Sequence, residues 1–322
     1  MYKISHQKIV GPVQSAARIL HIDLLCNSAP SWCRHLMEIA DSYTFVDAYN
    51  PYQIHDALCV RPTIIVFGGG SWNKETQYIC NDAIKIYLKN HPDVVSFAYW
   101  GDGILDSINN IDTSNINVVF CAFHEAVNKF KKEKKVNAEF AVHPIDTNIF
   151  YPDYSIPEIY DWCFVGTAYG NKRQKYVDEL KKNFPNCIIK GLGYNPEMPP
   201  CNYEETANIF RQSKIIININ DDEYSNLDSY FSDRLLLGMC AGKLVLTNKQ
   251  PGLNHLFKQT VNIDWYESMD ELKSKISFYL LNDEMRKNIG IRAGNDSSIY
   301  SMKNMIPKFC KTAMKYKRGL YV

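Results

Sequence analysis

The sequence predicts an α/β protein of two doubly wound domains, each a parallel sheet covered by helices on both faces. Short apolar runs rich in β-branched residues alternate with stretches of helical composition along the whole chain, the pattern of parallel strands joined by helices. This alternation is interrupted once, over residues 143–162, where three prolines disfavour helix. A chain of 322 residues is also long enough for two domains of ordinary size.

The first half contains six expected strands. The clearest is the unbroken run PTIIVF, residues 62–67, which ends in three glycines. The expected strands are 19–26, 43–46, 62–67, 94–100, 118–121 and 139–142, with helices at 31–40, 76–90 and 125–132.

The second half repeats the pattern after the proline-rich linker. Its expected strands are 162–166, 187–191, 214–220, 244–247 and 260–265, and its expected helices are 172–184, 203–211, one ending at Gly242, 253–257, 269–281, 283–293 and 301–317. We therefore divide the chain into an N-terminal domain, 1–143, a C-terminal domain, 144–300, and a last helix, 301–322.

Composition excludes several classes of protein. A net charge of +1 argues against a large nucleic-acid footprint, and no run approaches the roughly 18 apolar residues of a membrane span. No signal-peptide pattern precedes the first domain. The ten cysteines are scattered without a CxxC pair, which favours reduced thiols over disulfides or a metal site. These observations predict a cytoplasmic protein without a bound metal.

The segment YFSDRLLLGMCAGKLVLT, residues 230–247, predicts a helix that runs directly into a core strand. Arg234 falls in the first turn, beside Ser232 and Asp233 as candidate caps. Backbone N–H groups and a guanidinium at a helix start together suit a phosphate.

Two earlier loops follow strand ends in the same half. Gly166 and Thr167 precede Lys172 and Arg173, which open the next helix and would attract an anion, although a solvated basic helix start explains them as well. The next exit carries Gly191, Gly193 and Tyr194, where a flat ring could lie against the backbone, or where the chain simply turns.

Polar residues end the strand at 214–220. Asn220, Asp221 and Asp222 could contact hydroxyl groups or a metal, but no histidine accompanies them, and a strand-ending turn accounts for them well.

In the first half, the candidates also follow strands. Gly69, Gly70 and Trp72 follow one strand, and Trp100 and Asp102 end another. Asp102 lies between two glycines, where it could act as a base toward a hydroxyl or merely form an Asp-Gly turn.

Taken together, four segments resemble the GT-B glycosyltransferases, and the spore-maturation or spore-coat type among them. They are PIDTNIFYP (144–152), DWCFVGT with Lys172 and Arg173, SKIIININ (213–220) and SDRLLLGMCAGKLVLT (232–247). The resemblance covers about residues 140–305 and is thin over the first 90.

This resemblance implies two Rossmann-like domains facing a cleft, with the last helix crossing back to the first domain. It implies a nucleotide-diphosphate sugar, a UDP-sugar first, as co-substrate without an obligatory metal or other cofactor. Arg234, Lys172, Arg173, Gly166 and Thr167 would bind the diphosphate.

The remaining candidates divide between the donor and the acceptor. Gly191, Gly193, Tyr194, Asn220 and Asp233 would contact the base, ribose or sugar. On the side of the acceptor, which would be a glycan, a protein or a small molecule rather than nucleic acid, Asp102 would be the catalytic base beside Gly69, Gly70, Trp72 and Trp100.

One position departs from the family pattern. Leu237 stands where the family usually has a glutamate expected to hold the donor ribose, so either Glu205, Asp228 or Asp233 replaces it, or donor binding is altered or lost. Two alternatives to a transferase therefore remain: a catalytically silent nucleotide- or glycan-binding module, and an epimerase or phosphorylase on the same scaffold.

Overall fold

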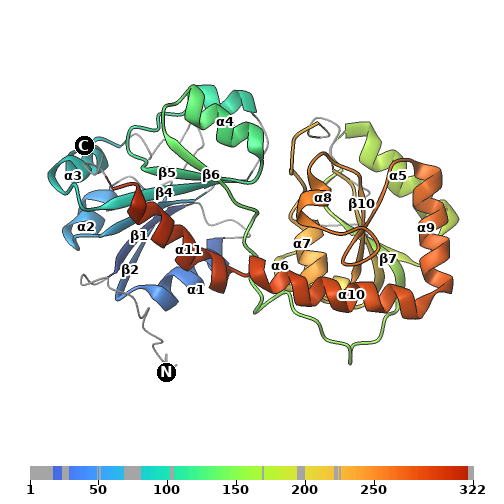
Figure 1. Ribbon diagram of the computed structural model, residues 1–322. Coiled ribbons are helices and arrows are strands. Elements are labelled where there is room, and N and C mark those ends of the chain that lie inside the picture. The colour runs from blue at the N-terminus through green and yellow to red at the C-terminus, as the bar shows by residue number, and fades with distance from the viewer. Residues whose placement is uncertain are drawn as a thin grey trace. The chain divides into compact units, whose positions relative to one another are not determined.

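The chain forms two units, each built on its own parallel sheet (Figure 1). The structure is a computed structural model that describes residues 17–23, 29–48, 50, 52–68, 81–101, 105–168, 170–193, 200–220, 224 and 226–317. The first unit comprises Met1–Val142 with Met302–Val322, and the second comprises His143–Ser301. The divisions expected from the sequence fall after residues 143 and 300, each one residue away from these bounds.

The first unit contains a six-stranded parallel sheet in the order β2-β1-β3-β4-β5-β6. Its strands are β1 (Arg18–Asp23), β2 (Ser42–Asp47), β3 (Ile64–Phe67), β4 (Val95–Trp100), β5 (Val118–Cys121) and β6 (Asn137–Phe140). Every residue of β3, β4 and β5 is buried, as expected for central strands covered on both faces.

Helices cover both faces of this sheet. Right-handed crossovers place α1 (Ala29–Ile39) on one face and α2 (Gln53–Cys59), α3 (Asp82–Asn90) and α4 (His124–Lys132) on the other. The last helix, α11 (Met302–Lys315), packs against α1 and β4 and so completes the first unit, as the resemblance implied.

Phe309 fixes α11 in place. Its ring stacks on Phe120 at 4.3 Å between centroids and also lies beside Trp32 and Tyr99. The apolar side of this helix belongs to the core, since Met305, Ile306, Phe309, Cys310 and Ala313 are all buried.

The second unit contains a five-stranded parallel sheet in the order β11-β10-β9-β7-β8. Its strands are β7 (Tyr160–Val165), β8 (Cys187–Lys190), β9 (Ser213–Asn218), β10 (Leu244–Asn248) and β11 (Asp264–Tyr266). Its helices are α5 (Gly170–Asn183), α6 (Tyr203–Arg211), α7 (Arg234–Cys240), α8 (Leu253–Leu256), α9 (Met269–Leu281) and α10 (Asp283–Ser297), followed by a 3₁₀ turn, Ser298–Tyr300.

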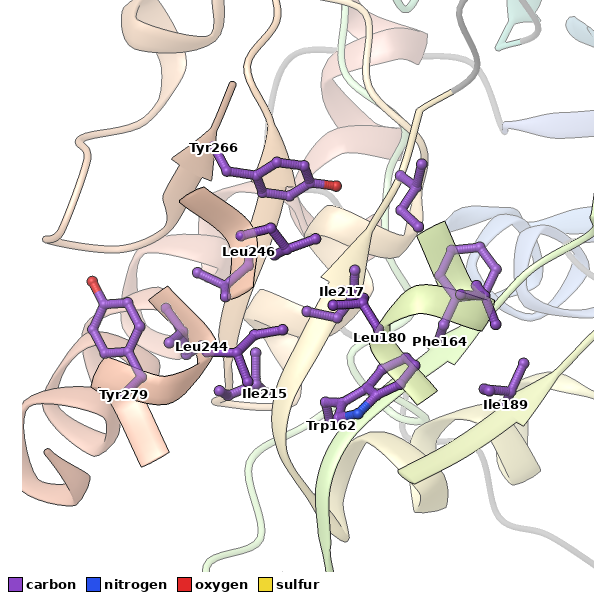
Figure 2. Packing of buried hydrophobic residues seen from close by; sticks show 14 of the residues in the cluster. Trp162, Phe164, Leu180, Ile189, Ile215, Ile217, Leu244, Leu246, Tyr266 and Tyr279 are labelled. Carbon is purple, nitrogen blue, oxygen red and sulfur yellow. The ribbon is translucent and has the colours of Figure 1, made fainter. Parts of the chain in front are cut away.

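One hydrophobic cluster of the second unit lies between the sheet and the helices α5 and α9 (Figure 2). Trp162, Ile215 and Leu244, from three adjacent strands, are wholly buried there. The Trp162 indole N–H donates to the carbonyl of Phe184, 2.8 Å away, so the one polar atom of this large side chain is satisfied.

Two short elements of the first unit were not predicted. Helix α2 has seven residues, and the 3₁₀ helix Leu105–Asn110 has six. Segments this short do not establish a helical period in the sequence, and α2 is instead held by packing on β2 and α3. Among the described residues, no helix is both long and apolar enough to cross a membrane.

Candidate functional site

The candidate site lies where the strand order of the second sheet reverses. Strand β7 connects to β8 on one side, while β9 pairs with β7 on the other. In open parallel sheets, the carboxyl ends of the two strands at such a switch point form the usual ligand crevice. Here those ends carry Gly166 and Thr167 after β7, and Asn218 to Asn220 at the end of β9.

Arg234 joins these two strand ends. Its Nε donates to the carbonyl oxygen of Val165 on β7, and its Nη1 donates to Oδ1 of Asn218 on β9 at 2.7 Å. The guanidinium also lies 4.4 Å above the ring of Phe164. Only 7% of the residue is exposed, so Arg234 supplies a fixed cation at the switch point rather than a mobile side chain.

A buried polar network continues from Asn218. Its Nδ2 donates to Oγ1 of Thr247 on β10 at 2.9 Å and to Oδ1 of Asn220 at 3.2 Å. The hydroxyl of Tyr266 on β11 donates to the carbonyl of Asn218 at 3.1 Å, and burial raises the pKa of that phenol far above its usual value. The four strands are therefore tied together at one edge by hydrogen bonds.

Asn220 ends this network with one donor unused. Its Oδ1 accepts from the backbone N–H of Ser232 at 2.9 Å, and its own N–H donates to Oδ1 of Asn248 at 2.7 Å. In the part of the chain that the structure describes, its Nδ2 is buried and has no hydrogen-bond partner. An unmade buried hydrogen bond costs about 1–3 kcal/mol, which an acceptor oxygen of a ligand would recover.

The two basic residues of the loop after β7 differ in their surroundings. Arg173 is 9% exposed and donates to the carbonyls of Ile219, at 3.0 Å, and of Thr167, at 3.1 Å. It holds the loop against the end of β9. The Lys172 ammonium lies 5.9 Å from the ring centroid of Tyr176 on the same helix. Their roles toward a diphosphate stay predictions.

The glycines of these loops permit close packing. A Cβ built on Gly166 would lie 2.0 Å from Nη2 of Arg234, and one on Gly191 would lie 1.9 Å from the carbonyl oxygen of Gly166. Gly191 also has a φ of +149°. The absence of side chains at Gly166 and Gly191 thus allows Arg234 and the two loops to pack closely against one another.

We expect Gly166→Ala to displace Arg234 and to weaken anion binding at this edge by about tenfold, since one charge-assisted hydrogen bond is worth about 1.5–3 kcal/mol. Isothermal titration with UDP measures the loss. Gly294→Ala is the control, because a Cβ there meets its nearest neighbour, Pro152, at 3.2 Å, and none of its nearest atoms belongs to Arg234. Unchanged affinity in Gly166→Ala would show that the position of Arg234 does not matter.

Helix α7 begins differently from the expectation. The Ser232 hydroxyl accepts from the backbone N–H of Arg234 at 3.4 Å, but Asp233 makes no side-chain cap. The Asp233 carboxylate instead lies 3.6 Å from Nδ1 of His143.

Leu237 is 7% exposed within α7, so it belongs to the core of the second unit. Two of its three possible substitutes are engaged elsewhere. Glu205 forms a capping box with Asn202 at the start of α6, and Asp228 accepts from the Ser229 hydroxyl at 2.9 Å. Asp233 is the one that adjoins Arg234 in sequence.

Five predicted site residues lie outside the described residues: Gly69, Gly70, Trp72, Asp102 and Tyr194. The same holds for Asp221 and Asp222. Trp100 is described, and it is a buried residue of β4 whose ring meets Phe130 edge-on at 5.8 Å. Across the described ranges, no group of three His, Cys, Asp or Glu side chains is arranged to hold a metal ion.

Asn218 and Thr247 are functional candidates that the sequence analysis did not select. A signal was present: Asn218 and Asn220 stand two residues apart in the run SKIIININ, on the same side of a buried strand. Two amides on one buried face require partners, and they find them at the ligand edge.

A cavity of about 730 Å³ lies at the opposite edge of the sheet, among Lys214, Leu244 and Arg286, near the starts of β9 and β10. Its central charges are already paired, since Glu158 binds both Lys243 and Arg286. We therefore place the site at the carboxyl edge.

Comparison with protein families places a match in the second unit. Residues 172–299 match a family model described as glycosyl transferase-like, and this segment contains Arg234, Asn218 and Asn220. The match covers most of the second unit. A comparison with curated protein sequences finds no match.

Solved structures extend the likeness to both units. Sucrose-phosphate synthase from Thermosynechococcus elongatus aligns over 92% of this chain and 99% of its own, with a TM-score of 0.61 and 8% identity. The chain has the GT-B glycosyltransferase fold. HepE of Anabaena, solved with UDP and glucose, has a TM-score of 0.61 at 10% identity over 92% of this chain and 100% of its own.

A third GT-B structure is similar over nearly its whole length. An alpha-glucosyltransferase in complex with UDP and a 13-mer DNA has a TM-score of 0.65 at 11% identity, over 94% of this chain and 100% of its own. The narrower resemblance to spore-maturation or spore-coat proteins stays a prediction.

Proposed function

We propose that this protein transfers a sugar from a nucleotide-diphosphate sugar, in the first instance a UDP-sugar, to an acceptor hydroxyl, without requiring a metal. The observation that carries the proposal is the pairing, at one switch point, of a fixed buried cation with an unused buried donor. Arg234 and the Nδ2 of Asn220 supply them, and both lie within the glycosyl transferase-like segment.

The chemistry follows from where charge develops. When the glycosidic bond to the diphosphate breaks, negative charge accumulates on the leaving phosphate oxygens. A preorganised cation in a poorly solvated crevice stabilises that charge without reorganisation. Because Arg234 is already held by Val165 and Asn218, its position does not depend on the ligand.

A UDP-sugar is the first candidate because HepE was solved as a complex with UDP and glucose, and the alpha-glucosyltransferase as one with UDP. The acceptor is a glycan, a protein or a small molecule. The DNA in the second complex is a ligand of that protein, and a net charge of +1 does not favour a nucleic-acid acceptor here. Asp102 remains the proposed base toward the acceptor hydroxyl.

A thermal-shift screen tests the donor. UDP, GDP and dTDP, each with and without an attached hexose, are added to the protein in the presence of EDTA. A ligand at 100 times its Kd stabilises the folded state by about 2.7 kcal/mol, so at least one should raise the melting temperature measurably. If none of the six ligands raised the melting temperature, the proposal of a nucleotide-sugar site would be wrong.

Product analysis then separates the reaction classes. A transferase releases the nucleoside diphosphate and, without an acceptor, hydrolyses the donor slowly. An epimerase would convert the free nucleotide sugar, and a phosphorylase would require phosphate. The buried Leu237 favours one further outcome, a silent binding module, which would bind the nucleotide and release nothing. Turnover that Asp102→Asn abolishes would exclude that module.

A further inference from the structure

The first unit contains a cluster of ionisable side chains that the proposed function does not use. His21 and Asp23 lie on β1, Cys33 lies on α1 and Tyr43 lies on β2. The cluster therefore occupies the space between the sheet and the helix that covers it.

His21 is at the centre of this cluster and is completely buried. Its Nε2 lies 3.5 Å from Oδ2 of Asp23, and its Nδ1 lies 2.9 Å from the hydroxyl of Tyr43 and 3.7 Å from Sγ of Cys33. The imidazole thus connects a carboxylate on one side with a thiol and a phenol on the other.

The Asp23 carboxylate packs directly against Gly68, which has no side chain. A Cβ there would lie 1.9 Å from Oδ2 of Asp23, so the carboxylate occupies the space that a larger residue would fill. Asp23 is 2% exposed. A buried carboxylate beside an imidazole favours the protonated ring.

The charges of the cluster favour a thiolate at its rim. Burial acts to lower the pKa of His21, but the interactions with Asp23 and Cys33 together outweigh burial, and the pKa is raised. Desolvation raises the pKa of Cys33, yet its hydrogen bonds to His21 and Tyr43 prevail, and the pKa is lowered. Burial raises the pKa of Tyr43, which keeps the phenol protonated as a donor.

Cys33 lies at the partly exposed end of the cluster, together with Tyr43. It is partly exposed, whereas His21 and Asp23 are buried. Cys187 in the second unit is likewise partly exposed, but burial raises its pKa. The two thiols therefore differ in their charged neighbours more than in their accessibility.

We propose that Cys33 is a modification site whose thiolate, held by His21 and Tyr43 while Asp23 keeps the His21 ring protonated, reacts with hydrogen peroxide and with soft electrophiles. With peroxide, the sulfur attacks one oxygen, an S–O bond forms as the O–O bond breaks, and hydroxide leaves and takes up a proton to give water. The sulfur loses two electrons and becomes a sulfenic acid, while peroxide gains two.

Alkylation with iodoacetamide, followed by mass spectrometry, tests the proposal on the full chain. The experiment uses a Cys26→Ser background, because Cys26 and Cys33 fall on one tryptic peptide. At pH 7 Cys33 should react about tenfold faster than Cys187, and its rate should reach half-maximum below about pH 8.5, the usual thiol value.

His21→Asn should move that midpoint to the usual thiol value or above, and Tyr43→Phe should move it part of the way while retaining the aromatic packing on His21. Circular dichroism checks the fold of each variant. After exposure to peroxide, dimedone should label Cys33 and leave Cys187 unlabelled.

The pH profile of the parent protein is decisive even if a variant fails to fold. A Cys33 midpoint at or above 8.5, or a rate equal to that of Cys187, would mean that the cluster only packs α1 against the sheet. A lowered midpoint that His21→Asn leaves unchanged in a folded protein would also overturn the assignment.

Discussion

Replacing Arg234 by alanine is expected to lower the affinity for UDP by about 10- to 100-fold, since hydrogen bonds to charged groups contribute about 1.5–3 kcal/mol and 1.4 kcal/mol corresponds to a factor of ten. The fixed cation at the β7–β9 switch point would be lost. Isothermal titration with UDP and with uridine measures the effect, and uridine, which lacks phosphate, should lose much less.

The chain offers a matched control in Arg211. It is 6% exposed, donates to the carbonyl of Ile149 at 3.0 Å and to Oδ1 of Asn208 at 2.7 Å, and lies 4.7 Å above the ring of Tyr151. Arg234 has the same set of partners: a carbonyl, an asparagine and an aromatic ring.

Arg211 ends α6, near the opposite edge of the sheet from the candidate site. The free energy of unfolding should fall by a comparable amount in both alanine variants, but only Arg234→Ala should lose affinity for UDP. Equal loss of affinity in the two would mean that general destabilisation, not the cation at the switch point, is responsible.

Glu158→Gln is expected to lower the free energy of unfolding by about 3–5 kcal/mol, the usual cost of breaking a buried ion pair. Glu158 lies 2.6 Å from Nζ of Lys243 and 2.6 Å from Nη2 of Arg286, residues that are 4% and 2% exposed. The amide keeps the shape of the side chain, but Lys243 loses the carboxylate that it pairs with, and Arg286 keeps only its ion pair with Asp283. Urea denaturation at pH 7 measures the difference.

The contribution of Glu158 to the stability of the folded state depends on pH. Burial acts to raise the pKa of Glu158, but its bonds to Arg286 and Lys243 outweigh burial and lower it. The carboxylate therefore stabilises the folded state above the unfolded pKa, about 4.3, and this contribution is lost as the pH falls through the folded value. The difference between the parent and Glu158→Gln should shrink below pH 4.

Glu267→Gln is the control for removal of one charge, because Glu267 pairs with Lys249 at the surface, where both side chains are more than half exposed. Its effect should stay below about 1 kcal/mol. A loss in Glu158→Gln as small as this would show that Lys243 and Arg286 do not need the carboxylate.

Three elements were predicted with the bounds that the structure gives them. Residues 118–121 and helices 203–211 and 269–281 coincide with β5, α6 and α9, since long or strongly apolar segments carry a clear period. Strand ends were less certain. The expected strand 214–220 ends as β9 at Asn218, where the side chains of Asn218 and Asn220 form a hydrogen bond with each other.

The site was predictable in place but not in detail. Spacing located Arg234 at the start of a helix beside a core strand, yet sequence could not show that its guanidinium lies between β7 and β9. Arg173, adjacent to Lys172, gave no sign that it binds the carbonyls of Thr167 and Ile219. Such partners come from strands distant in sequence, and only the folded sheet brings them together.

The stacking of Phe309 on Phe120 has a consequence for the newly made chain. A ribosome completes the second unit at Ser301, while the first unit still lacks α11. Until Met302–Lys315 emerges, Trp32, Tyr99 and Phe120 have no Phe309 to cover them. The domain synthesised first is therefore the last to be finished, and during that interval its aromatic face is exposed to chaperones and to aggregation.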